Sequence, residues 1–486
     1  MTINGGFAPT SSSSSPASDP TESDSVPPPR GGRDPRVDDP ANPAPIRIVA
    51  VELSDGVPPV PDDGGPSARR YGSAQVLVRV HDQLVGVLDV DLPSGGLTAA
   101  AHTAVIMERF GDLINKHLAG DGREPFDPWT DHPADIGSDC PARRQQTDSD
   151  PFVSVVVPTI GRTPRLRPAL ESLAALDYPR FEIIIVDNAP TVGTTARLIA
   201  ESEVLRSRVR YTTELQPGVT YARNHGLAVA NGTIVAFADD DVIVDRQWLR
   251  NLVAGFSGEH VVAVTGQVLA GELETPAQVW IEEYGGFAKG SLPRTFDKDG
   301  YDVVEDGRLR RVPASPRSIY PYLPGSYGTG ANMAFRTNAL RELGGFDHRL
   351  STGGEDIDVL MRVVLAGHTL VYEPAAIVWH AHRPDLTSLR RTMYTYGIGL
   401  SAVMFKCLAT DRRGRRALVR RLPSGIAHAI KPQSGKNNKK RTGYPAMLTI
   451  LEICGMVLGP AYFTAAAWSK RSGRSGRSGR SGRKST

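Results

Sequence analysis

Runs of apolar residues separated by polar turns divide the chain into two patterns. Near the start, three short valine-rich runs predict β-strands, at residues 46–53, 74–80 and 85–92. A helix-like spacing follows over residues 97–118. From residue 152 onward, apolar runs alternate with amphipathic segments, which is typical of strands and helices around a parallel sheet. The sequence therefore predicts a small β-rich module followed by a larger α/β domain.

One apolar run carries the densest chemistry of the chain. Residues 234–238 do not alternate with polar residues, which predicts a strand buried on both faces, and Asp239, Asp240 and Asp241 follow directly. They sit at the carboxyl end of that strand, where open α/β sheets bind ligands. Adjacent carboxylates repel, so a proton or a cation must neutralise them, and hard oxygen ligands suit Mg²⁺ or Mn²⁺. A solvated turn, with Asp245 as N-cap of the next helix, is the alternative.

The remaining elements of the α/β domain follow from the same alternation. Strands are expected at residues 152–157, 181–186, 209–213, 261–268 and 369–372. Helices are expected at 164–176, 195–205 and 337–343, from about 246, and in the segment that opens at Ser351. Residues 271–328 lack a clear period, and so long a stretch without structure in a compact domain is usually functional. Glu355 and Asp356 fall in the first turn of a predicted helix, where negative charge is favoured.

Changes in composition mark the ends of these units. Residues 1–45 are rich in proline and serine, and the tail repeats Arg-Ser-Gly, so both are expected to be disordered. The predicted organisation is a disordered segment (1–45), the β-rich module (46–118), a Pro- and Asp-rich linker (119–150), the α/β domain (151–383), a helical region (384–468) and a disordered basic tail (469–486).

The carboxyl-terminal region is basic and partly apolar, although the whole chain is nearly balanced, with 56 basic and 53 acidic residues. Residues 411–441 hold eleven Lys or Arg and one acid, which favours an anionic surface, either lipid or nucleic acid. Residues 444–468 are the most apolar stretch, interrupted by Glu452 and Pro460. We interpret this stretch as an interfacial helix pair at a membrane surface, and a buried packing helix is the alternative.

Cysteine content and the amino terminus bear on location. Cys140, Cys407 and Cys454 are odd in number and unclustered, so neither a disulfide framework nor a zinc site is indicated. Met1 opens a polar stretch, so no signal peptide is expected. Both observations agree with a reducing, cytosolic setting.

Eight short motifs follow one another in the α/β domain. They are Val-Pro-Thr (157–159), Val-Asp-Asn (186–188), Ala-Arg-Asn-His-Gly (222–226), the Asp triplet (239–241), Gly-Ala-Asn-Met-Ala-Phe (330–335), Gly-Gly-Phe-Asp (344–347), Gly-Gly-Glu-Asp (353–356) and Trp-His-Ala-His (379–382). In this order they make the chain resemble family 2 glycosyltransferases, which use nucleotide sugars and have the GT-A fold. The resemblance, from about residue 152 to 383, implies a GT-A (Rossmann-like) nucleotide-sugar domain.

The resemblance implies which residues hold the sugar donor. Three match positions that contact the base and ribose: Pro158, Thr159 and Asp187. Arg223 and Asn224 match the motif that closes over the nucleotide. Asp239 and Asp240 of the triplet complete the implied set of donor-binding residues.

A metal site and a general base are also implied by the resemblance. Asp239 and Asp241 match the outer members of an Asp-X-Asp motif that holds Mn²⁺ or Mg²⁺, with Asp241 as the direct ligand. His380 matches a histidine that completes the metal site in some relatives, and His382 is a rival. Asp356 matches the base that deprotonates the acceptor hydroxyl, with Glu355 as the second candidate. Such chemistry needs a cation for the diphosphate and a carboxylate for the poorly nucleophilic hydroxyl.

Each of these residues has a structural alternative. Asp187 could only end a strand in a turn, and Arg223 could lie on a solvated helix face. Asp356 could only offset the helix dipole, and His380 could be a satisfied structural histidine. Several residues between 271 and 328 could contact sugars or only pack: Trp280, Glu282, Glu283, Tyr284, Tyr320 and Tyr322.

The sequence therefore favours an inverting glycosyltransferase that moves a sugar from a nucleoside-diphosphate sugar to a glycan or lipid-linked acceptor. The basic, apolar carboxyl-terminal region predicts a location at the cytoplasmic face of the plasma membrane, in peripheral contact with anionic lipid. The resemblance to family 2 glycosyltransferases implies a role in bacterial cell-envelope polysaccharide synthesis. A catalytically silent nucleotide-sugar-binding protein is the first alternative. Nucleic-acid binding by the tail ranks last, because the tail lacks the aromatic residues that stack on bases.

Overall fold

A computed structural model gives the fold of most of the chain. It describes residues 42–63, 65, 69–127, 136, 150–285, 287, 289–305, 308–315, 319–322, 325–412, 414–431, 437, 440 and 443–478. The disorder expected for residues 1–45 therefore falls almost entirely outside the described residues, as do most of the linker at 119–150 and Cys140.

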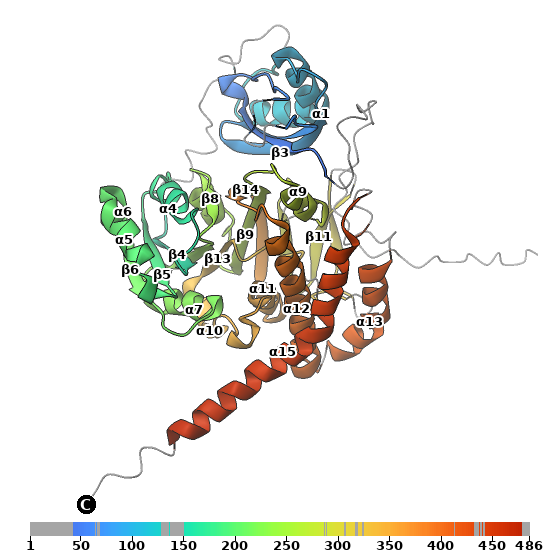
Figure 1. Cartoon of the computed structure of the whole chain (residues 1–486). Helices are drawn as coiled ribbons and strands as arrows, with labels where there is room; N and C mark the ends of the chain where they lie inside the picture. Colours follow the sequence, from blue (N-terminus) through green and yellow to red (C-terminus); the bar gives the residue numbers. More distant parts are fainter. Residues whose placement is uncertain are drawn as a thin grey trace, which may run out of the picture.

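The small amino-terminal module consists of a three-stranded sheet and one long helix. Its elements are β1 (Ile46–Glu52), β2 (Ser73–Val80), β3 (Gln83–Asp91) and α1 (Ala99–Gly120). β1 and β2 are parallel, β2 and β3 form an antiparallel hairpin, and the elements lie where the sequence pattern predicts them. Side chains on one face of α1, including Ile106 and Ile114, are fully buried against the sheet. Figure 1 shows this module above the larger domain.

The larger domain is built on one eleven-stranded sheet. Its strands are β4 (Val153–Thr159), β5 (Phe181–Asp187), β6 (Val209–Thr213), β7 (Ile234–Ala238), β8 (Val242–Val244), β9 (Val261–Ala270), β10 (Arg294–Asp297), β11 (Gly300–Glu305), β12 (Arg308–Pro313), β13 (Asn332–Arg336) and β14 (Thr369–His380). The strand order is β12-β11-β10-β14-β9-β13-β7-β4-β5-β6, with β8 paired to β14. The predicted α/β class is confirmed.

Helices cover both faces of this sheet (Figure 1). They are α4 (Leu166–Ala174), α5 (Thr194–Glu201), α6 (Glu203–Arg208), α7 (Val219–Val229), α8 (Trp248–Ala254), α9 (Pro276–Glu283), α10 (Thr337–Glu342) and α11 (Glu355–Leu365). All five residues of β7 are buried, as expected for a strand covered on both faces. β7 runs parallel to β4 and antiparallel to β13, so both strands flank the loop that carries the Asp triplet.

Two local expectations were wrong. Residues 271–328 are not structureless, because they contain α9 and the antiparallel strands β10, β11 and β12 that extend one edge of the sheet. Asp245 is not the N-cap of the next helix, because α8 begins at Trp248 with Gln247 as its N-cap. The Asp245 carboxylate instead accepts a hydrogen bond from the Gln247 amide at 2.9 Å and pairs with Arg79 of the small module at 2.7 Å.

The small module packs directly on the carboxyl-terminal parts of β9 and β14, two inner strands of the large sheet. Leu77 of β2 contacts Leu269 and Ile377 in one apolar cluster. The Tyr71 hydroxyl donates to the Glu274 carboxylate at 2.7 Å, and the Ile46 amide donates to a backbone carbonyl of the α/β domain at 2.9 Å. Apolar burial and these polar contacts therefore fix the module beside the strand ends that lead into the candidate site.

In the described part of the carboxyl-terminal region, three helices, α12 (Leu386–Thr410), α13 (Arg415–Ile430) and α15 (Ala446–Ser478), agree with the helical region that the sequence predicts. α12 is held to the α/β domain by buried Lys406, whose ammonium lies 2.7 Å from Asp347 and 2.6 Å from Asp358. α12 and α15 pack closely at glycines, since a Cβ on Gly455 would lie 2.1 Å from the Tyr394 carbonyl.

The apolar stretch at the end of the chain differs from the predicted helix pair. It belongs to one continuous helix, α15, which includes Pro460 and extends into the segment predicted to be a disordered tail. Buried Glu452 is satisfied, because its carboxylate accepts a hydrogen bond from the Tyr284 hydroxyl at 2.7 Å. Among the described residues, Ala446–Trp468 is one helical stretch whose length and apolar composition would suffice to cross a membrane.

Candidate active site

The Asp triplet lies on the loop between β7 and β8, at the carboxyl end of the parallel strands. The Thr159 hydroxyl, at the end of neighbouring β4, donates to the Asp240 carboxylate at 2.5 Å, and the Gly161 amide donates to the Thr159 hydroxyl at 2.9 Å. Burial, with a smaller contribution from the charges of Asp241 and Asp239, raises the pKa of Asp240 to about 7, although the hydrogen bond from Thr159 lowers it. The loop therefore concentrates more negative charge than its surroundings neutralise.

Asp241 lies beside His380 because of strand pairing. His380 ends β14 and is opposite Val242, the first residue of β8, in the antiparallel register. The His380 Nε2 atom lies 3.5 Å from Asp241 Oδ1, and the Arg383 guanidinium lies 3.6 Å from Asp241 Oδ2. Burial raises the pKa of Asp241, whereas the nearby His380 lowers it. The structure thus brings together two of the three predicted metal ligands.

The rival ligand His382 is engaged elsewhere. Its Nε2 lies 2.6 Å from the Glu282 carboxylate, and its Nδ1 lies 3.3 Å from the Nδ1 of His380. His380 therefore presents Nε2 toward Asp241, while both ring nitrogens of His382 already have partners.

Arg223 connects the triplet to the candidate base. Its side chain is 3% exposed, so it is not the solvated helix arginine of the alternative interpretation. One guanidinium nitrogen donates to Asp239 at 2.9 Å and to the Gly330 carbonyl at 3.3 Å, and the other donates to Glu355 at 2.7 Å. Asp239 is therefore turned toward a buried arginine. The guanidinium of Arg223 makes contacts within the protein, and its contact with a nucleotide stays a prediction.

The two candidate bases at the start of α11 differ in their surroundings. Glu355 is buried, and burial raises its pKa to about 7 against the charge of Arg223. Asp356 is half-buried, its Oδ2 accepts from the Gly330 amide at 2.8 Å, and its Oδ1 accepts from the Ile357 amide at 2.8 Å. A carboxylate has about four acceptor positions, so Asp356 is held by backbone donors and retains room for another donor.

The predicted nucleotide residues lie side by side at adjacent strand ends. Thr159 of β4 is opposite Asp187 of β5 in the parallel register. The buried Asp187 carboxylate accepts from the Ala189 amide and the Tyr211 hydroxyl, both at 3.0 Å. Asn224 is used internally, because its side-chain amide donates to the Phe346 carbonyl at 2.8 Å and accepts from the Phe346 amide at 2.9 Å.

Aromatic residues that the sequence analysis missed lie near the acidic groups. The pKa of Tyr396 on α12 is raised by burial and by the charges of Asp356, Asp239 and Asp241. Phe287 lies with its ring centroid 5.3 Å from that of His380 and 6.4 Å from that of Tyr396. Sequence periodicity gave no signal for either residue, because α12 with Tyr396 joins the site only through tertiary packing and Phe287 lies between α9 and β10 in a stretch without a clear period.

The aromatic residues that the sequence analysis named are placed in packing roles. Trp280 is buried between α9, α12 and α15, and Tyr320 and Tyr322 are buried in the main core of the α/β domain. Glu282 contributes to the site indirectly, through its contact with His382.

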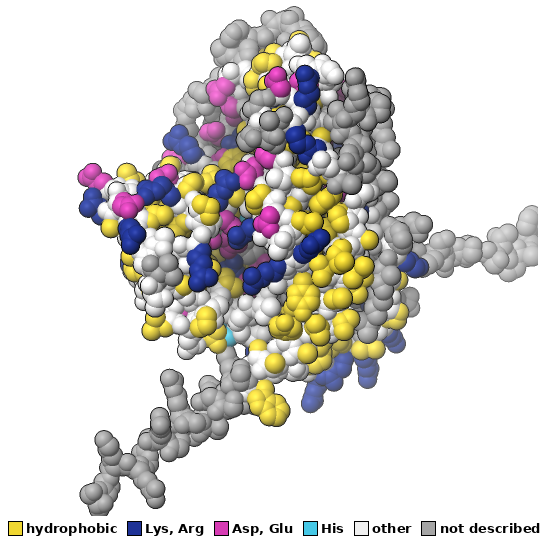
Figure 2. All heavy atoms as spheres, in the orientation of Figure 1, with side chains coloured by type: hydrophobic (Ala, Val, Ile, Leu, Met, Phe, Trp, Pro, Cys, Tyr) yellow, Lys and Arg dark blue, Asp and Glu magenta, His cyan; other side chains and the backbone are white. Residues whose placement is uncertain are grey.

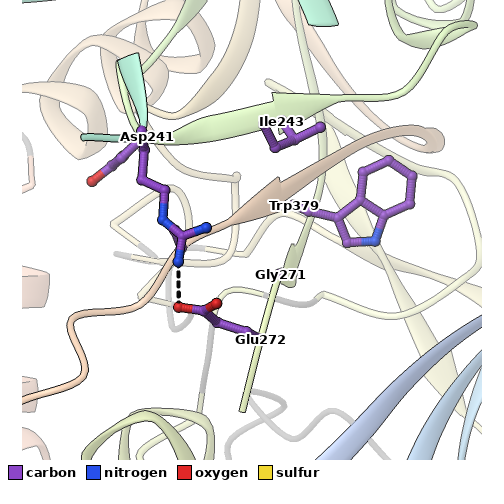
Figure 3. Close-up of a pocket in the computed structure, with 7 residues that line it drawn as sticks. Asp241, Ile243, Gly271, Glu272 and Trp379 are labelled. Atoms are coloured by element: carbon purple, nitrogen blue, oxygen red, sulfur yellow. Dashed lines mark hydrogen bonds and ion pairs between the residues drawn. The ribbon is translucent and has the colours of Figure 1, made fainter. Parts of the chain in front are cut away.

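A cavity of about 240 Å³ opens beside Asp241 (Figure 3). It is lined by Arg165, Asp241, Ile243, Gly271, Glu272, Trp379 and Ala381. Arg165 donates to Glu272 at 2.6 Å across it, the interaction drawn as a dashed line in Figure 3. Asp241 is the one residue of the predicted site among those that line it, so the cavity adjoins the triplet rather than containing the whole site.

Comparisons with known proteins match the α/β domain and the helices after it to glycosyltransferases. Residues 154–344 match the family described as Glycosyl transferase family 2, and residues 304–434 match Glycosyl transferase family group 2. The second match extends past residue 383 and includes α12 and α13.

Individual relatives are glycosyltransferases with moderate identity. The pre-mycofactocin glycosyltransferase of Mycobacterium tuberculosis (strain H37Rv) is 29% identical over 237 residues, covering 48% of this chain and 43% of that protein. The validoxylamine A glucosyltransferase of Streptomyces hygroscopicus subsp. jinggangensis is 32% identical over 288 residues, covering 54% of this chain and 60% of that protein. The chain thus matches about half the length of these curated relatives.

Among solved structures, a mannosyltransferase from Pyrobaculum calidifontis in complex with GDP-Man and Mn²⁺ aligns with a TM-score of 0.39 and 18% identity. That alignment covers 67% of this chain and 91% of that chain.

Proposed function

Because the chain belongs to glycosyl transferase family 2, we propose that it transfers a sugar from a nucleoside-diphosphate sugar to a hydroxyl group of a glycan or lipid-linked acceptor, with inversion. One arrangement carries this proposal. Buried Arg223 links Asp239 of the triplet to Glu355 and to Gly330, whose amide holds Asp356. Asp240 of the same triplet is bound by Thr159, which lies opposite Asp187 at the strand ends. A donor diphosphate and an acceptor hydroxyl need these groups on one side of a sheet.

The donor side of the proposed site uses the ends of adjacent strands. Pro158, Thr159 and Asp187 are proposed to hold the nucleoside, where the backbone of β4 and β5 fixes their positions. Asp240 is held by the hydrogen bond from Thr159 and is proposed to belong to the acidic group that faces the diphosphate. Asn224 is proposed to act indirectly. Its side chain binds the backbone of Phe346, and the Phe346 ring packs against the guanidinium of Arg223.

The residues around Asp241 fit a divalent cation. Asp241 and His380 supply carboxylate and imidazole donors 3.5 Å apart. Asp239 adds a second carboxylate, which also forms an ion pair with Arg223. Such oxygen and nitrogen donors suit Mn²⁺ or Mg²⁺. When bound there, the cation would neutralise charge on the diphosphate leaving group. Burial raises the pKa values of both Asp240 and Asp241, because the protein stabilises their negative charge poorly. A bound cation would stabilise that charge.

Asp356 is the proposed general base. It is ionisable, half-buried and oriented by two backbone amides, so it can receive the proton of an acceptor hydroxyl without losing its position. Glu355 is the weaker candidate, because it is buried and bound to Arg223.

We also propose that the acceptor is reached at a membrane surface, on the cytoplasmic side. α15 exposes large apolar side chains, with Val457 73% exposed and Trp468 77% exposed. Figure 2 shows apolar side chains gathered over the carboxyl-terminal helices, with Lys and Arg beside them. α13 adds exposed Arg416, Arg420 and others of the same charge. Sedimentation with vesicles of anionic lipid, but not of neutral lipid, is expected, and equal recovery with both would contradict the electrostatic part.

A donor screen tests the proposed activity. UDP-, GDP- and dTDP-sugars would be offered with Mn²⁺ or Mg²⁺ and a membrane extract as acceptor, following nucleoside-diphosphate release. The Asp241→Ala variant is expected to lose release with the productive donor by at least ~100-fold. Asp299→Ala, at an exposed turn between β10 and β11, is the matched control and should retain activity. Donor binding without release in every combination would instead indicate a silent sugar-nucleotide-binding protein.

A further inference from the structure

A second group of possible metal ligands lies in the small module, far in sequence from the transferase motifs. His81 is in the turn between β2 and β3, and His117 and Asp121 are one turn apart at the end of α1. The side chains of His81 and Asp121 are 0% and 3% exposed, and that of His117 is 24% exposed. Two buried polar side chains and one solvent-facing ligand make a site that is enclosed but still reachable.

The three ligand atoms are spaced as a bound metal requires. Asp121 Oδ2 lies 2.9 Å from His81 Nδ1 and 3.3 Å from His117 Nε2, and the two ring nitrogens are 3.2 Å apart. Metal–ligand bonds of about 2.0–2.2 Å in a tetrahedron separate the ligand atoms by roughly 3.3–3.6 Å. The three atoms therefore come close to forming one face of a tetrahedron, with the fourth position directed away from them.

Hydrogen bonding selects the ring form that binds metal. His81 Nε2 lies 3.1 Å from the Ile136 carbonyl oxygen, which only accepts, so Nε2 carries the proton. In the neutral ring, Nδ1 then presents a lone pair toward Asp121 Oδ2, which is also an acceptor. A cation between the three atoms would accept a lone pair from each of them, and the Ile136 carbonyl orients the His81 ring as outer partners of metal-bound histidines do.

The turn that holds His81 is fixed independently of the ring. His81 and Asp82 have φ of 54° and 61°, a left-handed conformation that is unusual for residues other than glycine. The Glu52 carboxylate stabilises it by accepting from the His81 amide at 3.0 Å and from the Asp82 amide at 2.9 Å. The ligand is thus positioned by the backbone, as preorganised metal sites require.

We propose that His81, His117 and Asp121 bind one zinc ion, with water as the fourth ligand, and so fasten the end of α1 to the β2–β3 turn. Two imidazoles and one carboxylate in this spacing suit Zn²⁺, and three protein ligands plus water complete four-coordination. The fastened turn lies two residues from Arg79, whose ion pair with Asp245 docks the module on the α/β domain. The proposal does not depend on transferase activity, and the site contains no cysteine, which is why the cysteine pattern gave no sign of it.

Zinc titration of the full chain tests the proposal. After dialysis against a chelator, Zn²⁺ stoichiometry and affinity would be measured by competition with a chromophoric chelator for wild type, His117→Ala and Asp121→Ala. Exposed His260→Ala is the matched control. Wild type and the control should bind one equivalent more than His117→Ala, or bind it more than ~100-fold tighter, because losing only an outer partner already costs about 10- to 100-fold.

A second readout separates a lost ligand from a lost fold. Added Zn²⁺ should raise the thermal midpoint of wild type and His260→Ala but not of His117→Ala, each compared with its own midpoint in chelator. Equal stoichiometry, equal affinity and equal zinc-induced shifts in wild type and His117→Ala would overturn the proposal. Nucleoside-diphosphate release with Mn²⁺ would be followed in parallel, so that the transferase proposal is tested separately from the zinc site.

Discussion

Arg223 offers the sharpest test of how the site is held together. Replacing it with methionine keeps most of the side-chain volume but removes the guanidinium that Glu355 and Asp239 share. Glu355 is 9% exposed at the side chain, so an ionised Glu355 would be left buried without its partner, next to Asp356. Breaking a buried ion pair in this way costs about 3–5 kcal/mol, and the loss at Asp239, which is 32% exposed, adds at most ~1 kcal/mol.

The assay is urea unfolding at pH 8, where Glu355 is ionised. Arg223→Met should lower the free energy of unfolding by about 3–5 kcal/mol, and adding Glu355→Gln should recover most of that loss because the buried charge is gone. Arg165→Met is the matched control: its ion pair with Glu272 is as short, at 2.6 Å, but the two side chains are 45% and 32% exposed, so about 0–1 kcal/mol is expected. Equal effects of Arg223→Met and Arg165→Met, or no recovery in the double variant, would refute the role assigned to Arg223.

Three further predictions concern stability and packing. Burial raises the Glu355 pKa from 4.5 to about 7, so the folded state keeps a proton that the unfolded chain loses. The resulting stability is complete below pH 4.5 and is lost as the pH rises through 7. Glu355→Gln should remove about 3 kcal/mol of this pH dependence of the free energy of unfolding, measured in urea melts between pH 5 and 8. Asn332→Leu should destabilise by at least ~3 kcal/mol in thermal unfolding, because it leaves the indole N–H of Trp248 and two buried carbonyls without partners. Gly455→Leu should loosen α15 from α12 and speed limited proteolysis there, with Leu458→Ala on the exposed face as a control that should not.

The central features of the site could be predicted from local patterns. The unbroken apolar run of β7 required a strand covered on both faces, and carboxylates directly after it had to lie at the strand end. Glu355 and Asp356 were predictable in a first helical turn, because residues beyond them carry apolar side chains at helical spacing. These features depend on residues close together in the sequence.

Other features depend on long-range packing that no local pattern encodes. The strands β10, β11 and β12 have only 4 to 6 residues each, too few for an alternation to stand out in residues 271–328. Asp245 was free to cap a helix by sequence alone, but Arg79 of another module lies 2.7 Å away. Tyr396 reaches the acidic groups only because Lys406 and close glycine contacts fix α12 between the α/β domain and α15.

The central claim is that Asp356, and not Glu355, takes the acceptor proton. Once the productive donor is known, the direct test is to compare turnover of wild type, Asp356→Asn and Glu355→Gln at saturating donor and acceptor. We predict that Asp356→Asn loses at least ~100-fold in turnover, whereas Glu355→Gln, which still accepts a hydrogen bond from Arg223, loses no more than about tenfold, or ~1.4 kcal/mol. A variant Asp356→Asn that turns over as fast as wild type while Glu355→Gln is inactive would contradict it.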